Sequence, residues 1–217
     1  MGADDTARRR ERMVEEQLVR RGIRDERVLA AMRTVPRERF LDPDLDRRAY
    51  RDEAVPIPDG QSISQPYMVA HMTELLAPQP GERVLELGTG SGYQAAIIAQ
   101  LGARVTTVER HPDLAMIARH RLIDLGYGER VHVRVADGSL GDPGGAPWDG
   151  IIVTAAAPSI PVELRDQLVD GGRLVIPVGP RDLQTLMRVV RHGNDWRETP
   201  HGQCVFVPLV GPGGFPG

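Results

Sequence analysis

The sequence predicts an α/β fold: a doubly wound, mostly parallel seven-stranded sheet with an antiparallel hairpin at one edge and added helices at the N-terminus. Two observations predict it. From residue 83 onward, short apolar runs alternate with helical patterns, which is typical of parallel strands joined by right-handed crossovers. A glycine-rich segment at 88–92 directly follows the first of these runs and precedes a helical pattern. Open sheets of this kind bind ligands at the carboxyl ends of their strands.

The chain is predicted to form one structural unit from two segments. Residues 1–80 would supply helices and an active-site loop, and residues 81–217 would supply the α/β core with its C-terminal antiparallel strands. The pattern of residues 5–22 predicts a charged helix with Val14 and Leu18 on its apolar side. The first segment is therefore expected to pack on the core.

The rest of the first segment is predicted to hold a short helix around 28–32, a long connection and a further helix. Residues 36–65 are broken by prolines and a glycine, and long ordered connections in compact domains are often functional. Pro66 then opens a helix whose apolar residues recur at helical spacing, and Pro78 ends it.

Strands and helices alternate through the core until the last two strands. The β-rich runs 183–191 and 203–210 are joined through Gly193 with no helix between them, so they are expected to pair antiparallel at one edge. The glycines and prolines of 211–217 suggest a frayed end. The other predicted strands lie at 83–87, 105–109, 131–135, 151–154 and 173–178, and the helices between them at 93–101, 112–125 and 161–168.

The composition is that of a globular domain. The 217 residues are 41% hydrophobic and 26% charged, and the net charge of −3 argues against the broad positive field that bulk nucleic-acid binding needs. Cys204 is the only cysteine and the six histidines show no metal-ligand spacing, so no disulfide and no metal are expected. A charged N-terminus and the lack of a long apolar run predict a cytoplasmic protein without membrane or nucleic-acid partners. We expect a monomer.

Three acidic residues accompany the glycine-rich loop. Glu86 precedes the loop, Glu109 ends the next strand and Asp137 follows the third. A carboxylate at the end of the second strand is placed to accept the hydroxyls of a ribose, and Asp137 lies at the same sheet edge, where it would accept from an exocyclic amine. A dinucleotide fingerprint would have glycine or alanine three positions after Gly90, where this chain has Tyr93. The spacing therefore favours a nucleoside without a pyrophosphate.

Four motifs resemble those of a known family. They are the segments 60–70 (GQSISQPYMVA), 86–94 (ELGTGSGYQ), 152–156 (IVTAA) and 206–209 (FVPL). In this order they resemble the protein-L-isoaspartate O-methyltransferases, a branch of the Rossmann-like class I methyltransferases that use S-adenosyl-L-methionine. The resemblance runs from about Val28 to Val210 and includes the segment 35–40 (VPRERF).

The resemblance implies a reaction and its substrate. A methyl group would pass from S-adenosyl-L-methionine to the free carboxylate of L-isoaspartyl residues in damaged peptides and proteins. The ester would then be lost as a succinimide forms, which starts repair. Because a carboxylate is already ionised at neutral pH, no general base is needed, and holding the carboxylate in line with the methyl group supplies much of the catalysis.

The resemblance also implies site residues. Ser64 carries over onto the family's active-site serine, whose hydroxyl would donate to one carboxylate oxygen of the substrate. Without the resemblance, Ser64 is a helix N-cap candidate. The implied peptide-binding residues are Ser62, Ser64, Val207 and Pro208. The implied cofactor-binding residues are Gln61, Ser62, Ile63, Glu86, Gly88, Thr89, Gly90, Ser91, Gly92, Glu109, Asp137, Gly138 and Thr154.

Three other functions stay open at this point. One is a methyltransferase of the same fold that acts on RNA, DNA or a small molecule, although amino-methylating nucleic-acid enzymes usually carry Asn or Asp before Pro-Pro where this chain has 154–158 (TAAAP). A silent cofactor-binding or peptide-binding module would keep the glycine loop and lose the Ser64 segment, which is present. An enzyme dedicated to one biosynthetic peptide would need the same residues as a repair enzyme.

Overall fold

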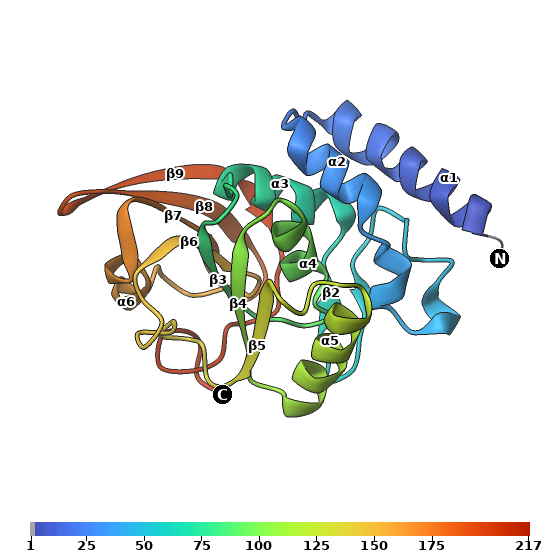
Figure 1. Cartoon of the computed structure of the whole chain (residues 1–217). Coiled ribbons are helices and arrows are strands. Elements are labelled where there is room, and N and C mark those ends of the chain that lie inside the picture. Colours follow the sequence, from blue (N-terminus) through green and yellow to red (C-terminus); the bar gives the residue numbers. More distant parts are fainter. Residues whose placement is uncertain (1–2) are drawn as a thin grey trace.

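The computed structural model describes residues 3–217. Its main sheet has seven strands: β3 (Arg83–Leu87), β4 (Arg104–Glu109), β5 (Val131–Val135), β6 (Trp148–Val153), β7 (Leu168–Val178), β8 (Gln184–His192) and β9 (Asp195–Cys204). They lie side by side in the order β5-β4-β3-β6-β7-β8-β9 (Figure 1). The first five strands of this order are parallel, and β8 and β9 are antiparallel to their neighbours. The predicted fold class, with its antiparallel edge hairpin, is confirmed.

The two faces of the sheet pack against different elements. Successive residues of β3 point to opposite faces, so Val84 joins one hydrophobic cluster and Leu85 joins the other. The Val84 face is covered by α2 (Glu26–Thr34), α3 (Pro66–Leu76), α4 (Tyr93–Gln100) and α5 (Pro112–Asp124). The Leu85 face packs against the short α6 (Val162–Asp166) through its buried Leu164. Burial of these two apolar faces drives formation of the layered core.

The N-terminal segment begins with α1 (Ala3–Met13), which continues as a π-helical turn over Val14–Leu18 and a 3-10 turn over Val19–Arg21. Val14 and Leu18 are fully buried, as their place on the apolar side predicts. Gly22 ends the helix in the left-handed conformation, at φ 97°. The segment shares one hydrophobic cluster with the core; the boundary at residue 80 stays a prediction.

The long connection between α2 and α3 is ordered by local structure. It contains two short 3-10 turns, Arg37–Phe40 and Pro43–Leu45, and a small antiparallel hairpin of β1 (Val55–Pro56) and β2 (Ser62–Ile63). The hairpin brings the chain to the start of α3, so the segment before this helix lies at a defined place beside the sheet.

The edge hairpin differs from the prediction in its second strand. That strand is β9, which ends at Cys204, so the prediction that the apolar run 203–210 forms it is wrong. Gly193 and Asn194 form the whole connection, so pairing begins at once with His192 opposite Asp195. β9 can be polar because, at the edge of the sheet, its side chains are exposed or half-buried except for Cys204. The apolar residues after Cys204 instead leave the sheet.

Three other elements differ from the prediction in their boundaries. β6 and β7 begin earlier than expected, at Trp148 and Leu168, and α6 is shorter. Leu168, which was expected to end a helix, instead begins β7 and pairs with Trp148, and a register shift follows this pair.

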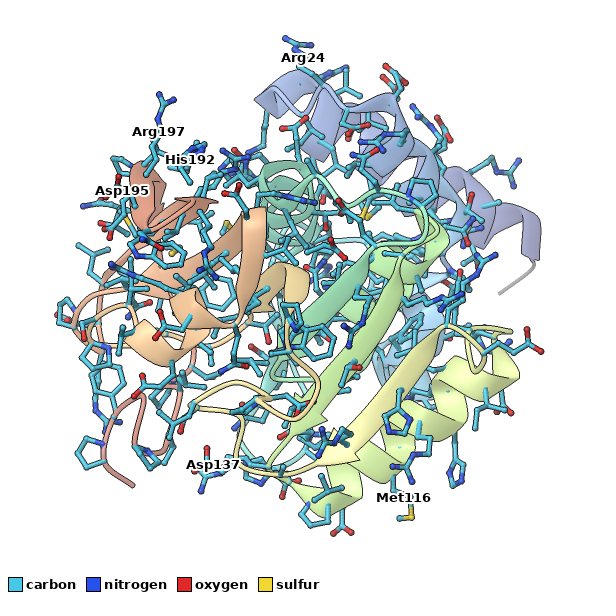
Figure 2. The ribbon with its side chains drawn as sticks, turned by 60° about the vertical axis from the view of Figure 1, so that its left-hand side comes forward. Arg24, Met116, Asp137, His192, Asp195 and Arg197 are labelled. Atoms are coloured by element: carbon cyan, nitrogen blue, oxygen red, sulfur yellow. The ribbon has the colours of Figure 1, made fainter. Side chains whose placement is uncertain are left out.

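The C-terminal tail is ordered, which corrects the expected frayed end. The backbone N–H of Phe215 donates to the Leu209 carbonyl at 2.7 Å, and that of Gly211 donates to the Phe215 carbonyl at 3.1 Å. The Arg181 guanidinium lies 4.8 Å from the centre of the Phe215 ring. The tail therefore closes on itself beside the loop that follows β5, where Asp137 lies (Figure 2). Within residues 3–217, no helix is long and apolar enough to cross a membrane.

Candidate active site

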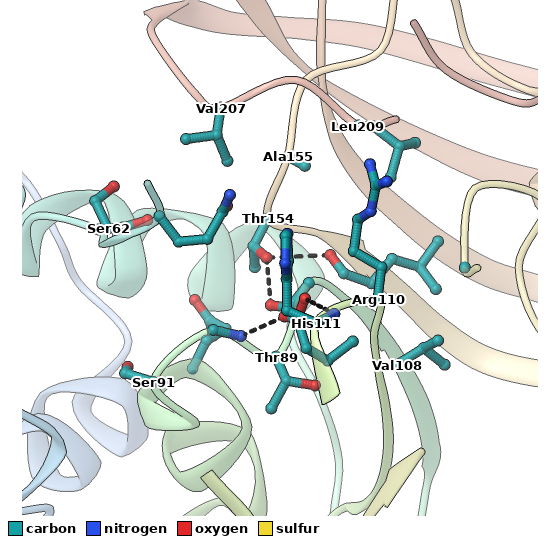
Figure 3. Close-up of a pocket in the computed structure, with 18 of the residues that line it drawn as sticks. Ser62, Thr89, Ser91, Val108, Arg110, His111, Thr154, Ala155, Val207 and Leu209 are labelled. Carbon is teal, nitrogen blue, oxygen red and sulfur yellow. Dashed lines mark hydrogen bonds between the residues drawn. The ribbon is translucent and has the colours of Figure 1, made fainter. Parts of the chain in front are cut away.

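A cavity of about 340 Å³ opens at the carboxyl ends of the central parallel strands (Figure 3). Three parts of the chain line it. The glycine loop and the residues after β4, β5 and β6 come from the core, residues 60–64 come from the N-terminal segment, and residues 207–210 come from the stretch after β9. Parallel strands end together at one edge, so the predicted ligand-binding residues of the core meet here.

The glycine loop is shaped by close backbone contacts. Gly88 has φ 98°, and a Cβ there would lie 2.4 Å from Thr154 Oγ1, so only glycine fits. The Thr154 hydroxyl donates to the Gly88 carbonyl at 2.6 Å and fixes the loop to the end of β6. A Cβ at Gly90 would have Ile57 Cδ1 as its sole neighbour within 4 Å. A side chain at Gly90 would therefore take up space at the cavity wall.

Glu109 is held at the cavity edge by two backbone donors. One carboxylate oxygen accepts the Gly90 N–H at 2.9 Å, and the other accepts the His111 N–H at 3.1 Å. The residue is 5% exposed and lines the cavity. Each carboxylate oxygen keeps a lone pair, so the group can still accept two ligand hydroxyls.

Asp137 and Gly138 form the neighbouring part of the wall. One Asp137 carboxylate oxygen accepts the Ser139 N–H at 2.8 Å, which orients the side chain. A Cβ at Gly138 would lie 3.0 Å from Leu87 Cδ2 and 3.1 Å from Val108 Cγ1, so a side chain would crowd the end of the sheet. Glycine at position 138 therefore lets the backbone itself form this part of the cavity wall.

The Ser64 segment bounds the cavity from the N-terminal part of the chain. Gln65, not Ser64, is the N-cap of α3, so the N-cap alternative is wrong. The Ser64 hydroxyl makes no hydrogen bond within residues 3–217. It is half-buried and lines the cavity directly before the positive end of a helix. An anionic ligand group would find a free donor and a favourable dipole at this place.

Most of the predicted site residues are brought together. Gln61, Ser62, Ile63, Ser64, Gly88, Thr89, Gly90, Ser91, Glu109, Asp137, Gly138, Thr154, Val207 and Pro208 all line the cavity. Figure 3 shows Ser62 and Val207 on one side, Thr89 and Ser91 in the glycine loop, and Arg110 and Leu209 on the other side. Their individual roles stay predictions.

Glu86 and Gly92 do not line the cavity. Glu86 is fully buried in β3, and neither carboxylate oxygen has a hydrogen-bond partner of good geometry. Burial raises the pKa of Glu86 to about 8, with a smaller contribution from the nearby Glu109 charge and an opposing one from Thr107. Gly92 caps α4 at φ 89°, and a Cβ there would lie 3.3 Å from Leu122 Cδ1 of α5. Both support the loop from behind.

The sequence pattern missed several lining residues. Arg110 and His111 follow Glu109 at the end of β4. Their position directly after a parallel strand could have predicted that they lie at the ligand-binding edge of the sheet. Leu209 belongs to the motif 206–209, from which only Val207 and Pro208 are predicted as site residues, and Val210 follows it directly; both reach the cavity through the path of the chain after β9. Within residues 3–217, no group of three His, Cys, Asp or Glu side chains is placed to hold a metal ion.

Comparison with known proteins identifies the family. The model of the family "Protein-L-isoaspartate(D-aspartate) O-methyltransferase (PCMT)" matches residues 8–213. The chain belongs to this family. A relative named protein-L-isoaspartate O-methyltransferase, from Methanoculleus marisnigri, is 53% identical over 217 residues, which are 100% of this chain and 98% of the relative. Another, from Syntrophobacter fumaroxidans, is 53% identical over 96% of this chain and 97% of its own length.

Solved structures of the family have the same fold. One named protein-L-isoaspartate O-methyltransferase aligns with a TM-score of 0.81 at 27% identity, over 94% of this chain and 66% of that chain. A Plasmodium falciparum structure, described as a protein-L-isoaspartate O-methyltransferase in complex with S-adenosyl-L-homocysteine, also aligns at 0.81, with 25% identity over 93% of this chain and 98% of that chain. The resemblance drawn from the motifs is confirmed.

Proposed function

We propose that this chain transfers the methyl group of S-adenosyl-L-methionine to the free carboxylate of L-isoaspartyl residues in damaged proteins and peptides. The observation that carries the proposal is that one cavity has residues suited to a nucleoside on one side and residues suited to an anion on the other. The glycine loop, Glu109 and Asp137 offer a nucleoside site, and the Ser64 segment offers an anion site beside it. The family match and the named relatives support the same reaction.

The core side of the cavity fits the cofactor. S-adenosyl-L-methionine supplies an electrophilic methyl group on a sulfonium when it is bound. Glu109 would accept the ribose hydroxyls with the lone pairs that its two backbone donors leave free. Asp137 would accept from the exocyclic amine of the adenine, and the glycine loop would lie against the methionine part, where Gly90 has no side chain to obstruct it.

The N-terminal side of the cavity fits the substrate carboxylate. The Ser64 hydroxyl, which has no partner of its own within the described chain, would donate to one carboxylate oxygen and leave the other to attack. The positive end of α3 would favour the anion at the same place. No side chain needs to remove a proton, because the carboxylate is the nucleophile in its ordinary ionised form. Catalysis would come from orientation.

The remaining lining favours repair of many proteins over one dedicated peptide. Ile63, Val207 and Pro208 would offer apolar and backbone contacts, which do not depend on one particular peptide sequence. The lone thiol of Cys204 suits the reducing cytoplasm. Burial raises the pKa of this thiol to about 11, so it is protonated at neutral pH and is not activated as a nucleophile.

The test is a pair of peptides that are identical except for L-isoaspartyl or L-aspartyl at one site, each incubated with labelled S-adenosyl-L-methionine. We expect label in the isoaspartyl peptide at a rate about a hundredfold higher, because one methylene displaces the carboxylate by about 1 Å from fixed donors. Equal labelling of both peptides, or label found only in RNA, a small molecule or one precursor peptide, would contradict the proposal. Isoaspartyl sites placed in several unrelated sequences should all be labelled if repair is general.

A further inference from the structure

Arg37 is a fully buried cation with no acidic partner. It lies in the VPRERF segment, to which the proposed reaction assigns no role, and its side chain is 0% exposed. Within residues 3–217 it forms no ion pair. Burial lowers the pKa of Arg37 to about 10, so it remains charged at neutral pH. Burying an unpaired charge lowers the stability of the folded state by several kcal/mol. A charge buried at that cost indicates a role besides stability.

The contacts of Arg37 lead to the cavity. Its Nη2–H donates to the Ser64 carbonyl at 2.7 Å, and its Nε–H donates to the Ala49 carbonyl at 2.7 Å. The guanidinium carbon lies 4.9 Å from the centre of the Tyr93 ring, which lines the cavity. Nη1 is buried and has no acceptor. One side chain therefore joins the connection after α2, the Ser64 segment and the start of α4.

We infer that Arg37 is a positioning residue for Ser64, and that its uncompensated charge also favours an anionic substrate in the cavity. The inference rests on the proposed function. The Ser64 hydroxyl makes no hydrogen bond that would fix its own direction, so that direction depends on where the backbone is held. The planar fork of a guanidinium can hold two carbonyls at once, whereas an ammonium group has no such geometry. A carboxylate bound beside Ser64 would lie near the buried cation, because Arg37 Nη2 is 2.7 Å from the Ser64 carbonyl oxygen.

Position and charge can be separated by two variants. Arg37→Lys keeps the charge and loses the fork, so kcat for an isoaspartyl peptide should fall about tenfold while KM changes less than threefold. Arg37→Gln loses both, so kcat should fall similarly and KM should also rise about tenfold. Arg39→Gln is the matched control: this exposed arginine lies in the same 3-10 turn, and its variant should keep the wild-type kcat and KM.

Every variant is purified in saturating S-adenosyl-L-homocysteine, the product formed from the cofactor, because a bound ligand stabilises the folded state. The dissociation constant of S-adenosyl-L-homocysteine is then measured for each variant. An unchanged constant shows that the cofactor side is intact. A folded Arg37→Lys with wild-type kcat, or a folded Arg37→Gln with wild-type KM, would overturn the inference. A variant that binds no cofactor product would also overturn it, because Arg37 would then be needed for folding itself. If the wild-type chain does not methylate the peptide, the proposed function has failed instead.

Discussion

A fully buried ionisable side chain lies behind the cofactor side of the cavity, and another lies behind the substrate side. The two differ in their hydrogen bonds and in their charge at neutral pH. Behind the glycine loop, Glu86 has no hydrogen-bond partner, and burial raises its pKa to about 8. Behind the Ser64 segment, Arg37 donates to two backbone carbonyls, and burial lowers its pKa only to about 10. At neutral pH the first is mostly uncharged and the second is charged.

The difference follows from the ordinary pKa values of the two groups. A carboxyl group starts near 4.5, so a shift of a few pH units neutralises it under working conditions. A guanidinium starts near 12.5 and remains charged after a similar shift. The glycine loop is thus supported by a neutral, unpaired group, and the Ser64 segment by a cation that acts through hydrogen bonds. Four changes test this contrast.

The largest expected effect is on stability, from Glu86→Gln. The folded-state pKa of Glu86 is raised from about 4.5 to about 8, so wild-type stability is lost as pH rises through this window. Gln cannot ionise. The variant should therefore be more stable than wild type at pH 8, by on the order of 3 kcal/mol, and nearly equal to it at pH 5. Urea unfolding at both pH values measures this, with the exposed Glu129→Gln as control. A stability difference that does not change with pH would refute it.

Glu109→Ala tests whether the cofactor side binds through this acid. Loss of a charged acceptor should weaken S-adenosyl-L-homocysteine binding by about 2 kcal/mol, roughly thirtyfold. Calorimetry on wild type, Glu109→Ala and the exposed control Glu129→Ala measures the three affinities. Equal binding by the first two would show that the ribose lies elsewhere.

Ser64→Ala should affect the other side alone. We expect methyl transfer to fall about tenfold, equal to 1.4 kcal/mol of barrier, because one donor to the substrate carboxylate is lost. The affinity for S-adenosyl-L-homocysteine should stay within twofold of wild type. Because the Ser64 side chain does not cap α3, the melting temperature should change little. An unchanged turnover would remove Ser64 from the active site.

The smallest effect is expected from Gly211→Ala in the C-terminal tail. A Cβ there would lie 2.3 Å from Ser139 Oγ and 2.7 Å from both Asp137 carboxylate oxygens, so the tail must move away. The affinity for S-adenosyl-L-homocysteine should fall about threefold, which is roughly 0.7 kcal/mol. The kcat measured at saturating cofactor and peptide should not change. Gly126→Ala is the control, since its φ is also positive and a Cβ there meets nothing within 4 Å. Equal effects of the two variants would mean that only backbone strain matters.

The core was predictable because its signals are local. The apolar runs at β3 and β4 and the glycines between β3 and α4 follow from spacings within a few residues, and the structure has them where the pattern indicates. β9 was not predictable in the same way. As an edge strand it carries polar residues together with Pro200 and Gly202, so its pattern resembled a loop while the apolar run after it resembled a strand.

By itself, the sequence determined the α/β class, the glycine loop with Glu109 and Asp137 at one sheet edge, and the motifs of the methyltransferase family. These depend on short-range periodicity and on the common direction of parallel strands. Only the tertiary structure decided that Glu86 lies behind the loop, that Arg37 holds Ser64 across 27 residues of chain, and that Gly213 meets Ser139 across 74. The reason is physical: burial and long-range hydrogen bonds depend on which distant surfaces pack together, and no local spacing contains that information.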